Sequence, residues 1–198
     1  MASSPHPPGS PAGPGDRLSP GAVGTVGHGA LPSAVFVGLL GRAGVTRVVD
    51  VRSVPGSRRH PQFGGDELAL DLPAAGIAYT WAPRLGGRRR GRPDSVHLAL
   101  GDGALRGYAD HMASEEFRAG LDELVELAAQ DRVAVLCAES LWWRCHRQLL
   151  ADALTVLRAG RVEHLFHDGR LQPHVPTPTA RRVDDVLVYD IGATPSLW

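Results

Sequence analysis

The stretch from Val133 to Leu154 constrains the fold more than any other part of this 198-residue chain. It opens with four apolar residues, 133–136, and a short run rich in valine predicts a buried strand. Polar residues follow, and the chain then enters a segment with the composition and spacing of a helix. A strand, a polar loop and a helix in this order indicate an α/β sheet. Ligands bind such sheets in the crevice at the carboxyl ends of the strands, so we expect a site at this loop.

Segments with strand and helix character alternate along the rest of the chain. We expect strands at residues 22–29, 47–52, 77–81, 133–137 and 162–166, and helices at residues 32–40, 67–75, 107–112, 114–130 and 145–159. Ser114 is the expected N-cap of the longest helix. This alternation predicts a three-layer α/β fold, in which a mostly parallel, Rossmann-like sheet carries helices on both faces.

The two ends of the chain differ from this pattern. Residues 1–22 are mostly proline, glycine and serine, and we expect them to be disordered because they bury too little apolar surface to offset the ordering entropy. Residues 23–170 are predicted to form a single α/β domain. Residues 171–198 are predicted to form a partly ordered tail, with a loose segment at 173–182 and an edge strand at 186–191.

Charge is unevenly distributed along the chain, although its formal net charge is zero. Residues 40–93 hold ten arginines and four acids, whereas residues 94–198 hold ten arginines and sixteen acids. This pattern favours a local anion-binding surface over a chain coated for nucleic acid. All 21 basic residues are arginine, so Schiff-base chemistry on a lysine is excluded.

Two cysteines in a chain of this size do not make a disulfide scaffold. The sequence has no apolar run of membrane-spanning length, and its N-terminus lacks the basic and apolar regions of a signal peptide. We therefore expect a cytoplasmic protein with reduced thiols and no membrane partner.

A set of short motifs lies in order between Gly24 and Phe166. They are Thr25-Val26-Gly27-His28, Val49–Arg58 with Pro61 and Phe63, Gly76–Tyr79, Leu85–Arg88, Tyr108–Met112 with Glu116 and Phe117, Cys137–Glu139, Cys145–Arg147 and Val162–Leu165. In combination they resemble a bacterial family known as domain of unknown function 488. The resemblance implies a three-layer α/β domain and implies no particular activity. Residues 140–144 depart from the family, in which many members carry polar residues between the cysteines.

One group of polar residues is expected to converge where the predicted parallel strands end. The candidate ligand-binding residues are Asp50, Arg52, Arg58 and Arg147. Guanidinium groups beside a carboxylate suit the binding of a phosphate or another anion. The alternative is that Asp50 pairs with an arginine in a purely structural network.

Cys137 is the candidate nucleophile. A reactive thiolate needs a lowered pKa, which a helix N-terminus and Arg144 or Arg147 would supply. The order strand, cysteine, loop, arginine, helix is similar to rhodaneses and cysteine-dependent phosphatases, but the six residues between Cys137 and Arg144 depart from both spacings. The alternative is a structural thiol at a strand end.

Three further residues complete the candidate catalytic set: His28 and His146 as acid or base, and Glu139 as a base or as a brace for an arginine. Cys145 and His146 are adjacent on the predicted helix, where successive side chains point about 100° apart. We therefore expect them not to face one another, and we expect Cys145 to be structural.

The spacing of the thiols and histidines matches neither thioredoxin nor any zinc motif, although a Cys137–Cys145 redox pair stays open. A metal site built from both cysteines, His146 and His28 has acceptable ligand types, but we assign no metal. The sequence identifies neither a cofactor nor an oligomeric state.

An arginine-rich segment and a tryptophan pair each have alternative interpretations. Arg88, Arg89, Arg90 and Arg92 either contact nucleic-acid phosphates or form a solvated loop, and the tryptophan pair at 142–143 either stacks on a base, caps the core or forms a partner surface. The leading hypothesis is an enzyme or binding domain for a phosphate-bearing or other anionic small molecule. The alternatives are a nucleic-acid-binding module and a rhodanese-like thiol redox or sulfur-transfer protein.

Overall fold

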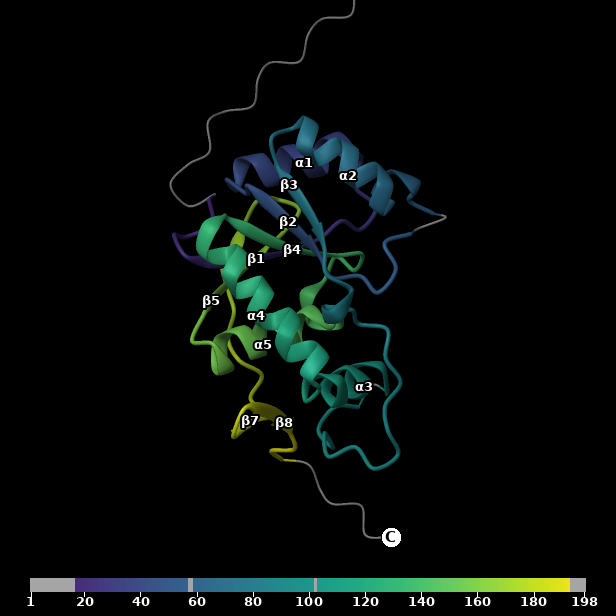
Figure 1. Ribbon diagram of the computed structural model, residues 1–198, viewed down its shortest axis with the longest axis vertical. Coiled ribbons are helices and arrows are strands. Elements are labelled where there is room, and N and C mark those ends of the chain that lie inside the picture. The colour runs from purple at the N-terminus through teal and green to yellow at the C-terminus, as the bar shows by residue number, and fades with distance from the viewer. Residues whose placement is uncertain (1–16, 57–58, 102, 193–198) are drawn as a thin grey trace, which may run out of the picture.

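A six-stranded sheet forms the centre of the molecule in the computed structural model, which describes residues 17–56, 59–101 and 103–192 (Figure 1). The strands are β1 (Ala22–Gly27), β2 (Arg47–Asp50), β3 (Ala78–Trp81), β4 (Val133–Cys137), β5 (Arg161–Leu165) and β6 (Leu171–Pro173), in the spatial order β3-β2-β4-β1-β5-β6. The first five strands are parallel to their neighbours, and β6 runs antiparallel to β5.

Helices cover both faces of this sheet. They are α1 (Ser33–Arg42), α2 (Gly65–Ala74), α3 (Gly103–Met112), α4 (Glu115–Gln130) and α5 (Arg147–Leu157), with 3-10 turns η1 (Pro61–Phe63), η2 (Pro83–Leu85) and η3 (Trp142–Arg144). One core cluster lies between the sheet and α1 and α2, and a second lies between the sheet and α3, α4 and α5. The predicted three-layer α/β fold is therefore confirmed.

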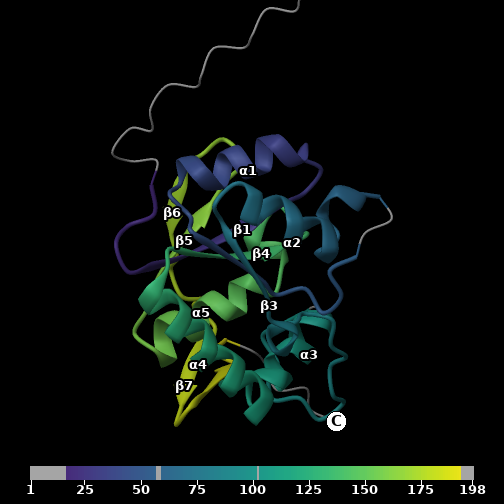
Figure 2. The same ribbon diagram turned by 45° about the horizontal axis from the view of Figure 1, so that its top comes forward.

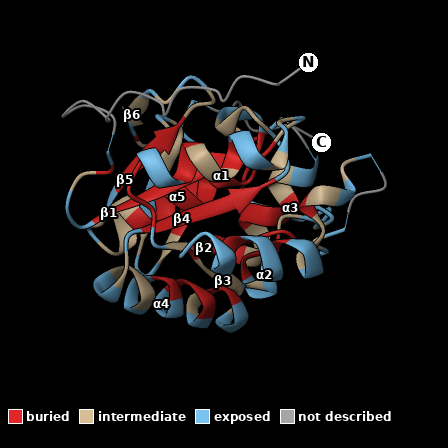
Figure 3. Ribbon diagram, turned by 90° about the horizontal axis from the view of Figure 1, so that it is seen from above, coloured by how far each residue is buried: buried red, intermediate tan, exposed pale blue. Residues whose placement is uncertain are grey.

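Strand β4 shows why this sheet is buried on both faces. Val133 and Val135 pack into the core under α3, α4 and α5, whereas Ala134 and Leu136 pack into the core under α1 and α2. Side chains alternate across a strand, so a strand between two helical layers must be apolar at every position. In Figure 3 the central strands are buried, while the helices bury one side and expose the other.

The predicted cap of α4 is also confirmed. The Ser114 hydroxyl accepts a hydrogen bond from the backbone N–H of Phe117 at 3.1 Å, which satisfies one of the free donors of the first turn. Within the part of the chain that the structure describes, no helix combines the length and apolar character needed to cross a membrane.

The C-terminal part differs from the prediction. Ala180–Val183 (β7) and Val186–Tyr189 (β8) form an antiparallel hairpin that is separate from the main sheet. Figure 2 shows β6 beside β5 and the hairpin beyond α5, on the side away from α1. The expected edge strand at 186–191 is thus wrong as an edge, because β6 occupies the sheet edge and Leu187 and Tyr189 pack into the helical layer. The expected loose segment is also partly wrong, since β7 begins within it.

Candidate functional site

A cavity of about 390 Å³ opens at the carboxyl edge of the sheet. The loops after β2 and β4 form its walls, together with the glycine-rich loop after η2, the start of α3 and the short linker before α5. Parallel register explains this convergence: Gly27 pairs with Cys137 and Asp50 pairs with Leu136, so β1, β2 and β4 end side by side. Both cysteines and His146 are among the lining residues.

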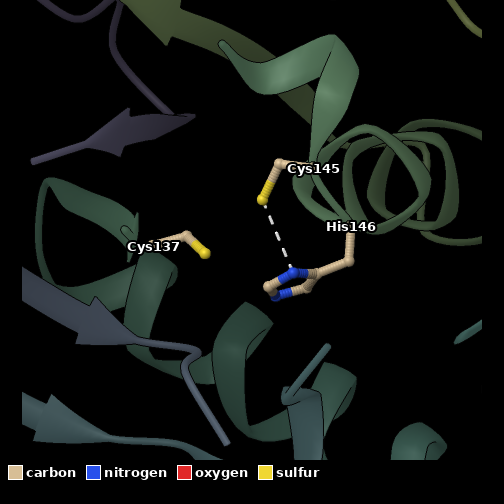
Figure 4. Close-up of side chains that lie close together, drawn as sticks. All are labelled: Cys137, Cys145 and His146. Atoms are coloured by element: carbon tan, nitrogen blue, oxygen red, sulfur yellow. Dashed lines mark hydrogen bonds between the residues drawn. The ribbon is translucent and has the colours of Figure 1, made fainter. Parts of the chain in front are cut away.

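The thiol of Cys145 faces a base. Its Sγ lies 3.5 Å from Nδ1 of His146, and the side chains of Cys137, Cys145 and His146 point toward one another in Figure 4. The other ring nitrogen, Nε2, donates to the backbone carbonyl of Val51 at 3.2 Å. Because a carbonyl only accepts, Nε2 carries the hydrogen, and Nδ1 presents its lone pair to the thiol.

This pairing overturns one expectation. Cys145 and His146 were expected not to face one another on a helix, but α5 begins only at Arg147 and Cys145 is extended, with φ −133° and ψ 152°. The helical offset of about 100° therefore does not apply to this pair. Because Cys145 lies in the linker between η3 and α5, its thiol can contact the ring of the next residue, His146.

Gly87 allows the backbone to approach this ring. A Cβ atom there would lie 2.2 Å from Nδ1 of His146, which is too close for any side chain. The buried ring of Tyr108 packs on His146 at a centroid distance of 4.9 Å. Neither residue was assigned a role from the sequence.

The pKa values of the two neighbouring thiols are shifted in opposite directions. A hydrogen bond from Cys137 holds the pKa of the Cys145 thiol well below its ordinary value, and His146 and Arg147 lower it further. The same hydrogen bond and burial raise the pKa of Cys137 well above its ordinary value. Of the two thiols, Cys145 is therefore the one whose deprotonation these contacts favour.

Arg147 is buried, and among the described residues it has no acidic partner. It is 1 % exposed, and its Nη2 donates to the backbone carbonyl of Glu139. Among the described residues its Nε has no hydrogen-bond partner, and no carboxylate forms an ion pair with it. A buried guanidinium without a counter-charge is costly, so the Cys145 thiolate is the natural balance for this cation.

Asp50 and Arg52 are largely engaged with other protein groups. Asp50 is fully buried and accepts from Nε of Arg52 at 2.8 Å and from the hydroxyl of Tyr79 at 2.9 Å. Nη1 of Arg52 donates to the carbonyl of Phe63 at 2.8 Å, while the residue also borders the cavity. This geometry favours the structural alternative for Asp50.

Residues 33–154 match the family model described as domain of unknown function DUF488. The chain belongs to the DUF488 family. Among curated proteins and among solved structures, no match was found. The match spans the segment from α1 to α5, and so contains both cysteines, His146 and Arg147.

His28 is not among the residues that line the cavity. The ring stacks on Phe63 at 4.2 Å, and its Nδ1 donates to the carbonyl of Gly29 at 2.8 Å. Burial lowers the pKa of His28 to about 4, so the ring is neutral at neutral pH. The other ring nitrogen of His28, Nε2, lies 3.5 Å from Nη1 of Arg52, and Arg52 borders the cavity.

Glu139 lines the cavity with an exposed side chain. Its carboxylate accepts from the backbone N–H of Leu141 at 3.1 Å, while its backbone carbonyl, not its carboxylate, contacts Arg147. Of the candidate residues, Cys137, His146, Glu139 and Arg52 thus border the cavity, and His28, Asp50 and Arg147 do not. Arg58 lies outside the described residues.

Two arginines of the basic loop are already paired. Arg92 forms an ion pair with Asp94 at 2.7 Å, and Arg89 lies 3.8 Å from Glu116. Arg88 lines the cavity, as does Arg144. These pairings reduce the free positive charge that the loop offers to a nucleic acid.

A second buried cluster of polar side chains was not predicted from the sequence. The Thr25 hydroxyl lies 2.7 Å from Nδ1 of His164, whose Nε2 lies 3.0 Å from Nδ1 of His174, and Nε2 of His174 donates to Asp152 at 2.8 Å. We call these four residues the histidine relay. Trp142 stacks on His164 at 3.9 Å with an angle of 4°, so it packs inside the protein. Trp143 is 44 % exposed.

Proposed function

We propose that this protein is a cysteine-dependent enzyme acting on an anionic small molecule, with Cys145 as the nucleophile and His146 as its base. The observation that carries the proposal is the 3.5 Å contact between the Cys145 Sγ and Nδ1 of His146, whose ring is oriented by the Val51 carbonyl. A nucleophile, a base and a third group that orients the base are the elements of nucleophilic catalysis. The sequence favoured Cys137 for this role, but the local base favours Cys145.

The proton has a defined route in this arrangement. Nδ1 of His146 takes the proton of the Cys145 thiol, and the Val51 carbonyl keeps Nε2–H in place. The thiolate then attacks the electrophilic atom of the substrate, and the imidazolium returns its proton to the leaving group. Arg147 acts as a positioning residue, because its charge stabilises the thiolate.

The charge of the cavity supports an anionic substrate. Three arginines line it (Arg52, Arg88 and Arg144) with one acid, Glu139. Arg88 and Arg144 are exposed, and neither forms an ion pair with another described residue. Guanidinium groups in such positions bind carboxylate or phosphate in a bidentate manner. We also propose a cytoplasmic location, in which both thiols stay reduced.

The test is the rate of alkylation of the native protein by iodoacetamide as a function of pH, with mass spectrometric assignment. We expect Cys145 to react first, with an apparent pKa below the value of about 8.5 for a free thiol. His146→Asn places an amide near Nδ1 but provides no base, so the apparent pKa of Cys145 should rise. If both thiols stay inert until the protein unfolds, Cys145 is structural and the proposal fails.

A further inference from the structure

We propose that Cys137 and Cys145 form a redox dithiol that reduces small, negatively charged disulfides bound in the cavity. The inference rests on the proposed role of Cys145 as the nucleophile. It assigns the second thiol, Cys137, to the resolving step and names the substrate class.

The position of the two sulfur atoms supports this assignment. The Sγ atoms of Cys137 and Cys145 and a ring nitrogen of His146 all lie within 4.8 Å of one another, and both cysteines line the same cavity. A substrate sulfur bonded to Cys145 is therefore within reach of Cys137 without passing through the protein core. The thiols come from different elements, since Cys137 ends β4 and Cys145 lies in the linker before α5.

The reaction balances without any further reagent. The Cys145 thiolate attacks one sulfur of the substrate disulfide, so a mixed disulfide forms and one substrate thiolate leaves with a proton from the His146 imidazolium. Cys137 then gives its proton to Nδ1 of His146 and attacks the sulfur of Cys145. The mixed disulfide breaks, the second substrate thiol leaves, and a Cys137–Cys145 disulfide remains. The dithiol loses two electrons and the substrate gains them.

The same three ligand atoms are of the types that zinc accepts. The charge on Arg147 favours dithiol–disulfide exchange over zinc binding. Two thiolates would neutralise a divalent metal ion and leave the buried guanidinium without a counter-charge among the described residues. One thiolate balances Arg147, and the second thiol, which lines the same cavity, stays available for dithiol exchange.

The walls of the cavity set the substrate class. Arg88 and Arg144 offer two guanidinium groups, while Val54 and Leu105 provide apolar surface. A disulfide flanked by carboxylates, with short apolar stretches between charge and sulfur, fits this combination. A disulfide that carries amines meets repulsion from the same arginines.

The experiment uses the full reduced chain with glutathione disulfide as the probe, followed by intact-mass spectrometry and thiol release. The wild-type protein should lose two hydrogen atoms in mass and release both probe thiols for each chain. Cys137→Ser should stop at a mixed disulfide on Cys145 and release one probe thiol. Cys145→Ser should stay unmodified, and circular dichroism checks that each variant is folded.

Each outcome supports or overturns a separate claim. A wild-type protein that keeps a mixed disulfide on Cys145 overturns the resolving role of Cys137 but leaves Cys145 as the nucleophile. A protein that does not react at all overturns the proposed function as well. One equivalent of zinc in the protein as purified, bound through these thiols, also overturns the dithiol. The wild-type masses alone separate these outcomes if a serine variant fails to fold.

The substrate class is tested separately with cystamine, a disulfide that carries two amines. For each probe, the rate of reduction by the protein is divided by the rate of reduction of the same probe by free dithiothreitol. This ratio corrects for the intrinsic reactivity of each disulfide. We expect the anionic probe to be favoured by about tenfold or more, since opposite charge raises the local concentration of a ligand. Equal normalised rates would overturn the anionic class.

Discussion

Two buried polar clusters lie around α5: the histidine relay and a group that we call the thiol cluster, which consists of Cys137, Cys145, His146 and Arg147. Their polar groups are satisfied to different degrees. Asp152 in the relay accepts from His174, from the backbone and hydroxyl of Thr177 and from the Tyr189 hydroxyl. In the thiol cluster, Arg147 keeps an Nε without a hydrogen-bond partner among the described residues. A cluster with every group paired stabilises a fold, whereas an unpaired buried charge beside a cavity is typical of a reactive site.

One hydrogen position in the relay follows from its acidic end. The Asp152 carboxylate only accepts, so Nε2 of His174 donates to it, and Nδ1 of His174 lies 3.0 Å from Nε2 of His164. Nδ1 of His164 and the Thr25 hydroxyl share a hydrogen bond at 2.7 Å. None of the four relay residues borders the cavity. The relay ties residues after β6 to the sheet and to α5.

The largest expected effect is on stability, from Asp152→Ala. The change leaves four donors without their acceptor, so we expect the free energy of unfolding to fall by about 3–5 kcal/mol. Urea unfolding followed by circular dichroism measures this loss. Asp185→Ala, at an exposed position, is the matched control and should change stability by less than about 0.5 kcal/mol. In the folded fraction, the alkylation rate of Cys145 should be unchanged. A loss below about 1 kcal/mol for Asp152→Ala would remove the structural interpretation of the relay.

Acid should act on the buried histidines first. Burial lowers the pKa of His164 to about 3 and that of His28 to about 4, from an ordinary value of 6.5. Unfolded chains therefore bind more protons than folded ones below about pH 6.5, and stability falls as the pH falls. We expect a loss of about 2–3 kcal/mol between pH 6.5 and pH 4, measured by urea unfolding at each pH.

His164→Gln tests the contribution of the relay to this acid sensitivity. The glutamine amide keeps a donor toward His174 but does not titrate, so the dependence of stability on pH should be flatter than in the wild-type protein. Equal slopes for the two proteins would show that the relay does not cause the loss. Alkylation of Cys145 reports on the other cluster and should rise with pH instead.

Arg147→Met should separate reactivity from stability. Loss of the buried cation removes one cause of the lowered Cys145 pKa, so the alkylation rate at pH 7 should drop by about tenfold. Stability should change little, because Arg147 forms no ion pair with a described carboxylate and an apolar side chain of similar length is often a neutral replacement for a buried charge. Arg161→Met, at an exposed position, is the control and should change neither quantity. A destabilisation as large as that of Asp152→Ala would make Arg147 a structural residue and weaken the comparison.

The sequence predicted the sheet and its helices for a physical reason. β4 is apolar at each position because both of its faces are covered, and that pattern is local and readable. The pairing of Cys145 with His146 was not readable, since it depends on an extended residue that ends η3, and η3 is held by Trp142 against His164. The relay was hidden for a similar reason. His174 lies in a proline-rich segment without periodicity, and only the tertiary fold brings it to Asp152.

The smallest expected effect comes from Gly87→Ala, and it tests how tightly the thiol cluster is positioned. The added methyl group would overlap the ring of His146, so we expect a shift of Nδ1 away from Cys145 and a destabilisation of about 1–2 kcal/mol. The alkylation rate of Cys145 at neutral pH should fall about threefold, since part of the pKa lowering by His146 is lost. Gly101→Ala, where no atom lies within 4 Å of the added carbon, is the matched loop control. If Gly87→Ala leaves both the rate and the stability unchanged, His146 does not hold the thiol through a fixed ring position. The thiol cluster would then resemble the relay, as packing without a precise reactive geometry.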